Sequence, residues 1–83
     1  MVHLFVFRAL TGMERNLLKR NLARTEKRIA QGREHVERQR QIVEELQRKG
    51  QDPGRSADLL RLFTETLDAH LDERDRLVSE LTH

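Results

Sequence analysis

The sequence contains no cysteine, no tryptophan, no tyrosine and only one proline. Without cysteine, the chain has no disulfide, no thiolate metal ligand and no cysteine nucleophile. Its longest apolar run, residues 4–7, is too short to cross a bilayer. That run also lacks the preceding basic segment and the cleavage site of small residues that a secretory signal needs. These absences predict a cytoplasmic protein.

Charged residues make up 36% of the chain, which equals the hydrophobic fraction, and three phenylalanines are its only aromatic residues besides histidine. Eighty-three residues form at most one small domain with a limited core. Abundant Glu, Arg, Leu and Lys with few aromatic residues is typical of long helices or coiled coils, and disorder is the alternative. The periodicity of the apolar residues favours helices.

Residues that favour helix ends divide the chain into two helices. Thr11 and Glu14 have the spacing of a capping box, and Gly50 fits the left-handed position that follows a helix. Asp52 and Pro53 then fit the cap and the first position of the next helix. We therefore expect an all-α hairpin that turns near Asp52 and Pro53. The predicted helices span residues 12–49 and 53–81.

The hairpin is predicted to occupy residues 12–83 as a single domain, preceded by a hydrophobic extension, residues 1–11. Three interpretations of the extension remain open. It packs on the helices as a strand or short helix, it binds a partner or a membrane surface, or it lies upstream of a natural start at Met13.

Apolar residues recur in both helices at alternating steps of three and four, the spacing of a coiled coil. A short turn makes the two helices antiparallel, so the numbers of facing residues sum to a constant, predicted as about 103. This register places His70 over Gly32, where a glycine otherwise costs about 1 kcal/mol relative to alanine. The predicted seam consists of Leu22, Ile29, Gly32, Val36, Val43, Leu60, Phe63, Leu67, His70, Leu77 and Leu81.

Two helices bury only one stripe of side chains each, so the sequence predicts further burial by self-association. Ala57, Leu71 and Val78 lie on one flank of the second helix and have no apolar partner in the predicted hairpin. We expect them to form the interface of a homodimer, which would complete a four-helix bundle by two-fold symmetry.

No pattern of catalytic residues is present, and we expect no enzyme activity, no cofactor, no metal ion and no small-molecule substrate. His35 and His70 match no standard spacing of metal ligands. An exposed histidine on a helical bundle can accept a phosphoryl group, and His35 with Arg38 is a lesser alternative of this phosphorelay type.

Nucleic-acid binding is the main alternative to a protein partner. Residues 13–49 carry 11 Arg and Lys against 6 Glu, whereas residues 52–83 carry 4 Arg against 8 Asp and Glu. A basic helix suits contacts with phosphates. The candidate contacts in the first helix are Arg20, Arg24 and Lys27.

Several short motifs resemble a set of uncharacterised, hypothetical proteins of alphaproteobacteria. They include Met13-Glu14-Arg15, Ile29-x-x-Gly32-x-x-His35, Gln39-x-x-Ile42-Val43-x-Glu45-Leu46, Gly50-x-Asp52, Leu59-Leu60-x-x-Phe63 and His70-x-x-x-Arg74-Asp75-Arg76-Leu77. The resemblance covers residues 13–81 and implies no activity and no site residues. The sequence therefore predicts a small helical interaction or scaffold protein that dimerises or docks on a helical partner.

Overall fold

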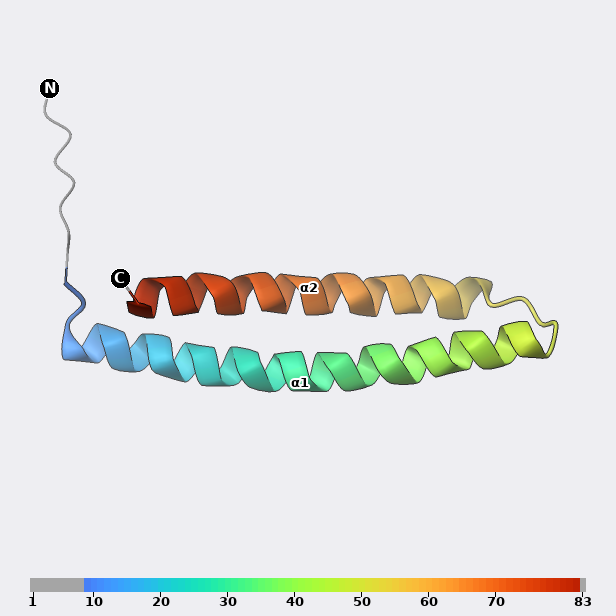
Figure 1. The fold of residues 1–83 in the computed structure, drawn as a ribbon, viewed down its shortest axis with the longest axis horizontal. Helices are drawn as coiled ribbons and strands as arrows, with labels where there is room; N and C mark the ends of the chain where they lie inside the picture. The colour runs from blue at the N-terminus through green and yellow to red at the C-terminus, as the bar shows by residue number, and fades with distance from the viewer. Residues whose placement is uncertain (1–8, 83) are drawn as a thin grey trace, which may run out of the picture.

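The computed structural model describes residues 9–82, and within that range it contains two helices and no strand. Helix α1 spans Gly12–Arg48 and helix α2 spans Gly54–Thr82. The helices run antiparallel side by side and are joined by one short turn (Figure 1). The predicted all-α hairpin is confirmed, and each predicted helix end lies within one residue of the observed one. The part of the predicted extension in residues 1–8 lies outside the described residues.

Both ends of α1 have the hydrogen bonds that their sequences predict. The Thr11 hydroxyl accepts a bond from the Glu14 amide at 3.0 Å, and the Glu14 carboxylate accepts one from the Thr11 amide. At the other end, Gly50 has a φ of 70°, and its amide donates to the carbonyl of Gln47. These bonds satisfy groups that a helix end leaves without partners, so α1 begins and ends where its caps lie.

Helix α2 begins one residue later than predicted. The first helical bond runs from the Ala57 amide to the Pro53 carbonyl, which places Pro53 at the cap and Gly54 at the first helical position. The Asp52 carboxylate accepts a bond from the Gly54 amide at 2.9 Å. Asp52 therefore still caps the helix, but from the residue before the cap.

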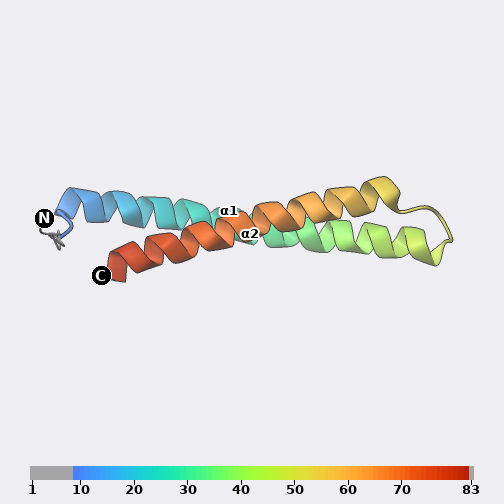
Figure 2. The ribbon, with the colours of Figure 1, turned by 90° about the horizontal axis from the view of Figure 1, so that it is seen from above.

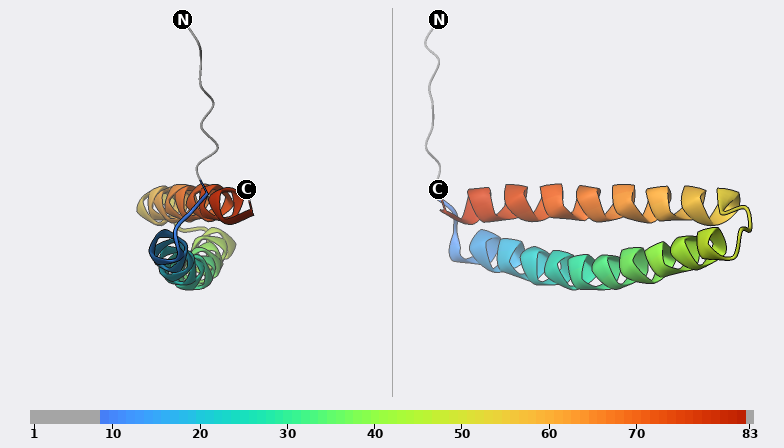
Figure 3. Two further views of the ribbon diagram at one scale, coloured as in Figure 1. Left: turned by 90° about the vertical axis from the view of Figure 1, so that its left-hand side faces the viewer. Right: turned by 45° about the vertical axis from the view of Figure 1, so that its right-hand side comes forward.

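The seam between the helices holds the most buried side chains of the described chain. Leu77 is 1% exposed, and Thr25, Ile29, Gln39 and Val43 are also buried. Every residue of the predicted seam is buried or half-buried. The helices cross near their midpoints when seen from above (Figure 2), and α1 curves gently with its convex side away from α2 (Figure 3). A long helix curves in this way when it wraps around a buried partner.

The predicted register is wrong by about one helical turn. The atoms nearest to a Cβ built on Gly32 belong to Leu67, with Cδ1 at 3.2 Å, and not to His70. The numbers of this pair sum to 99 rather than 103. When the numbers of facing residues sum to 99, each three-residue step along the seam of α1 lies opposite a three-residue step along the seam of α2. Each four-residue step likewise lies opposite a four-residue step. At 103 the two sets of steps are out of phase, so the layers cannot align.

Candidate interaction surfaces

Two polar contacts tie the helices together at opposite ends of the hairpin. The buried side chain of Gln39 donates from Nε2 to the carbonyl of Ser56 at 2.9 Å, close to the turn. At the open end, the Arg15 guanidinium donates to the carbonyl of Leu81 at 3.3 Å. A cation in this position satisfies a free carbonyl and opposes the negative end of the helix dipole. The hairpin is therefore held closed at both ends.

The predicted dimer residues lie on one side of α2 and differ in exposure. Ala57 and Leu71 are half-buried, and only Val78 is exposed, at 39%. These three residues define the Leu71–Val78 flank. The hairpin alone already covers much of two of them, which leaves a thin apolar stripe rather than a broad patch.

A larger apolar cluster lies on the opposite side of the hairpin, near the turn. Ile42 of α1 is 43% exposed, and Leu59 and Leu62 of α2 are 40% and 54% exposed. Three shallow hollows lie along this side. Arg38 lines two of them and Leu59 lines two of them, so the hollows form one continuous surface across both helices. We call this side the Ile42–Leu59 flank.

The Ile42–Leu59 flank becomes charged towards the open end. Arg28 lies two heptads before Ile42 on α1, and Glu73 and Glu80 lie two and three heptads after Leu59 on α2. Residues one heptad apart lie on the same face of a coiled-coil helix. The flank is therefore apolar near the turn, basic along the first half of α1 and acidic along the last half of α2.

The basic segment of α1, residues 12–33, has no charge partner on α2. Within residues 9–82, each ion pair joins residues at most four positions apart, and none crosses from α1 to α2. The predicted phosphate contacts, Arg20, Arg24 and Lys27, are exposed and form no ion pair with any described residue. The basic segment is therefore available for an external acidic partner.

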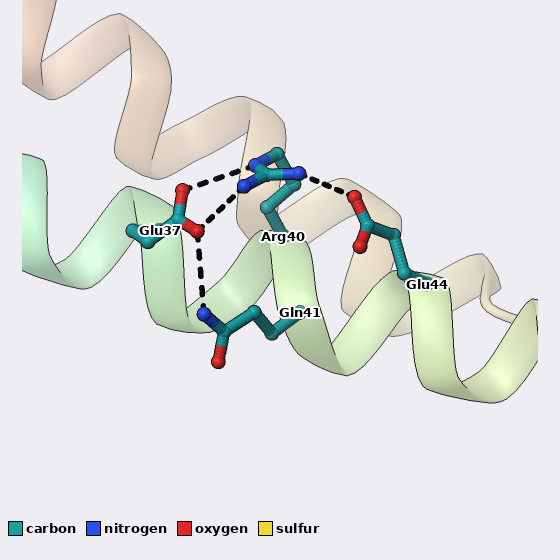
Figure 4. A network of polar contacts seen from close by, with 4 residues as sticks. All are labelled: Glu37, Arg40, Gln41 and Glu44. Atoms are coloured by element: carbon teal, nitrogen blue, oxygen red, sulfur yellow. Dashed lines mark hydrogen bonds and ion pairs between the residues drawn. The ribbon is translucent and has the colours of Figure 1, made fainter.

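Away from the basic segment, arginines are enclosed by carboxylates of their own helix. Arg40 lies between Glu37 and Glu44, and Gln41 also donates to Glu37 at 3.2 Å (Figure 4). The hydrogen bond from Arg40 is the main cause that lowers the pKa of Glu37 below its ordinary value of 4.5. The same carboxylates raise the pKa of Arg40. Arg40 is therefore paired within its own helix, unlike the arginines of the basic segment.

Helix α2 carries a similar network around Arg76, which bonds Glu73 and also bonds Glu80 at 2.7 Å. The bond from Arg76 lowers the pKa of Glu73, again from 4.5. One arginine here faces two carboxylates, so this part of α2 keeps a net negative charge. The acidic segment of α2, residues 68–82, holds five acidic and two basic residues in all.

His35 of α1 contacts a seam residue of α2. The ring of His35 lies 5.7 Å from the ring of Phe63 in a tilted arrangement, and His70 is half-buried. No group of three His, Asp or Glu residues within 9–82 is placed to hold a metal ion. The phosphorelay interpretation of His35 with Arg38 stays a prediction.

The register predicted from the sequence also places Ile42 beside Leu59 on one flank of the hairpin, but that flank was not chosen as the interface and Leu62 was not singled out. Leu59 and Leu62 each precede a seam residue, Leu60 and Phe63, so they fall beside the stripe that the partner helix covers. Met13 and Leu17 were also missed, and they are 83% and 55% exposed at the start of α1. Apolar residues next to a seam are easily counted with it.

Comparison with protein families, with curated proteins and with solved structures finds no match to this chain. The resemblance to hypothetical alphaproteobacterial proteins therefore stays a prediction. Neither described helix is long and apolar enough to span a membrane.

Proposed function

We propose that this protein is a small, non-catalytic helical interaction protein of the cytoplasm that acts by self-association. The observation that carries this proposal is the apolar cluster on the Ile42–Leu59 flank. Its three large side chains belong to both helices, line hollows that share residues, and are each at least 40% exposed. Isolated exposed apolar residues are common, but a contiguous group bordered by charges is typical of an interface.

A second copy of the chain is a suitable partner for this surface. The net charge is only +2, so two copies repel each other weakly. Packing one hairpin on another buries a second apolar stripe and gives the four-helix arrangement that a lone hairpin lacks. A different helical protein would dock on the same surface. The test of self-association must therefore distinguish the two partners.

Matched charge substitutions on the two flanks test the proposal. Leu59→Glu with Leu62→Glu places two charges in the Ile42–Leu59 flank, and Leu71→Glu with Val78→Glu does the same on the Leu71–Val78 flank. Light scattering should find a dimer for the unmodified chain and for the second variant, and a monomer for the first. Circular dichroism checks that each variant remains helical.

Other results would change the conclusion in defined ways. If only the Leu71–Val78 variant dissociates, the interface lies on the flank that the sequence predicted. If the unmodified chain is a monomer at every concentration tested, self-association is wrong, and the exposed cluster must serve a different protein.

Nucleic-acid binding is a second candidate function because the basic segment of α1 has no acidic partner within the described chain. Arg20, Arg24 and Lys27 lie along one exposed face of that segment and make no ion pair there. Phosphates could supply the missing charge. The absence of tryptophan and tyrosine leaves only phenylalanine and histidine for stacking on bases, so contacts with the phosphate backbone would dominate.

Fluorescence anisotropy with random-sequence DNA and RNA tests this candidate. Phosphate binding predicts an affinity that falls steeply with salt and is lost when Arg20, Arg24 and Lys27 are all changed to glutamate. The matched control changes Arg40, which is enclosed by Glu37 and Glu44, and should bind as the unmodified chain does. Equal binding by the triple variant would rule the candidate out.

A further inference from the structure

We propose that the dimer is a two-fold bundle in which both turns lie at the same end and α1 of each copy packs against α2 of the other. This inference rests on the self-association proposed above and specifies its geometry. Two hairpins that meet face to face have two symmetric choices. Either the turns lie together and α1 faces α2 of the partner, or the turns lie at opposite ends and each helix faces its own counterpart.

The size of the apolar cluster requires contact along the whole hairpin. From their exposed fractions, Ile42, Leu59 and Leu62 together present on the order of 200 Å², whereas each partner in a stable complex buries about 800 Å². A dimer joined only near the turns would therefore be too small. The charged remainder of the flank must also lie against the partner, and its pattern selects between the two arrangements.

The charge pattern favours turns at the same end. The basic segment, residues 12–33, holds seven basic and two acidic residues, and the acidic segment, residues 68–82, holds five acidic and two basic residues. With the turns together, each basic segment lies along the acidic segment of the partner. With the turns at opposite ends, the basic segment lies along residues 34–48 of the partner's α1, and the acidic segment lies along residues 54–67 of the partner's α2. Both of these stretches are nearly neutral. Only the first choice pairs opposite charges.

The level of individual residues agrees with this choice. In the observed register, an α1 residue lies level with the α2 residue whose number brings the sum of the two near 99. When the partner's turn lies at the same end, the same sum relates α1 of one copy to α2 of the other. Arg24 and Arg28 then bracket Glu73 of the partner. Ile42 meets the partner's Leu59 in the same way, so the apolar cluster packs on itself. The reversed arrangement instead brings Arg24 near Arg38 of the partner.

This geometry also accounts for the uncompensated charge of α1. Its own α2 supplies no ion pair to the basic segment within residues 9–82. The acidic segment of α2 keeps a net charge of −3, because its five acidic residues are matched only by Arg74 and Arg76. A second copy brings the two segments together twice, once on each side of the symmetry axis.

Distances between spin labels test the arrangement, and the absence of native cysteine makes any introduced cysteine unique. The label is placed at the turn by Gln51→Cys, since Gln51 is exposed. Turns at the same end predict a label separation within about 30 Å, because neighbouring helix axes lie 8–10 Å apart. Turns at opposite ends predict about 55 Å, the length of the 37-residue α1.

A control label comes from Glu65→Cys, which lies exposed near the middle of α2 and outside the acidic segment, and should give a short separation in either dimer. A short control distance with a long distance at Gln51 overturns the same-end geometry and leaves self-association standing. No measurable pair distance at either position, together with monomeric light scattering, overturns both.

As a second readout, raising salt from about 0.05 M to about 1 M should weaken the same-end dimer at least tenfold, since screening reduces its ion pairs. A dimer unchanged by salt would contradict the proposed charge pairing.

Discussion

Replacing Gly32 by alanine tests which residue of α2 faces the narrowest point of the hairpin. Alanine favours a helix over glycine by about 1 kcal/mol. The new methyl group, however, would lie 3.2 Å from Cδ1 of Leu67, and moving that side chain off its preferred rotamer costs about 0.5–1.5 kcal/mol. The two effects nearly cancel. We expect Gly32→Ala to change the free energy of unfolding by no more than about 0.5 kcal/mol.

The same substitution should behave differently once Leu67 is shortened. In a Leu67→Ala background the crowding is gone, so Gly32→Ala should stabilise by the full helix preference of about 1 kcal/mol. In a His70→Ala background it should have the same small effect as in the unmodified chain. The difference between backgrounds is a coupling energy, and contacting residues typically couple by 0.5 kcal/mol or more.

Urea unfolding followed by circular dichroism measures each free energy, at one fixed protein concentration because association would shift all values. If Leu67→Ala prevents folding, Leu67→Val also removes Cδ1 and can replace it. The reasoning is refuted if Gly32→Ala couples to His70 and not to Leu67. That result would restore the register with a sum near 103.

Two further predictions concern polar contacts of α1. Changing the buried Gln39 to alanine removes its hydrogen bond to the Ser56 carbonyl, worth about 1 kcal/mol, and the burial of about one methylene group. Thermal unfolding should therefore show that the free energy of unfolding falls by about 2 kcal/mol. The control, Gln41→Ala at an exposed position, should lower it by less than about 0.5 kcal/mol. The second concerns acid. Because Arg40 lowers the pKa of Glu37 below 4.5, this pair contributes stability above that pH and loses it as pH falls through the lowered pKa. An NMR titration of Glu37 should give a midpoint below 4.5 that rises in Arg40→Gln, and an unchanged midpoint would contradict the assigned cause.

The sequence predicts the hairpin well because its signals are local. The capping box at Thr11, the glycine after α1 and the Asp-Pro pair before α2 each depend on a few neighbouring residues. They place both helices to within one residue of the structure. A seam with steps of three and four is likewise a property of one helix at a time.

Register and exposure are harder, because they depend on how the two helices meet. The seams repeat every seven residues, so several registers bring apolar residues together, and a sum near 103 pairs Val43 with Leu60 plausibly. Matching the order of the three- and four-residue steps would have excluded 103 and left 99 among the sums that differ from it by multiples of seven. Exposure at Leu59 and Leu62 depends on the crossing of the helices, so the sequence alone did not predict how exposed these residues are. The charge distribution also predicts that the basic first half of α1 pairs with the acidic second half of α2, but no ion pair within residues 9–82 joins the two helices. Such pairs depend on side-chain reach, which periodicity does not contain.

Thermal unfolding across a range of protein concentrations tests most directly the central claim that the hairpin is half of a larger fold. If folding and dimerisation are coupled, mass action stabilises the folded state as concentration rises. With an unfolding enthalpy of about 0.7 kcal/mol per residue, the midpoint should rise by about 5 °C for each tenfold increase. A midpoint that does not change over a hundredfold range, with a mass of 9.8 kDa throughout, would show that the hairpin folds and persists alone.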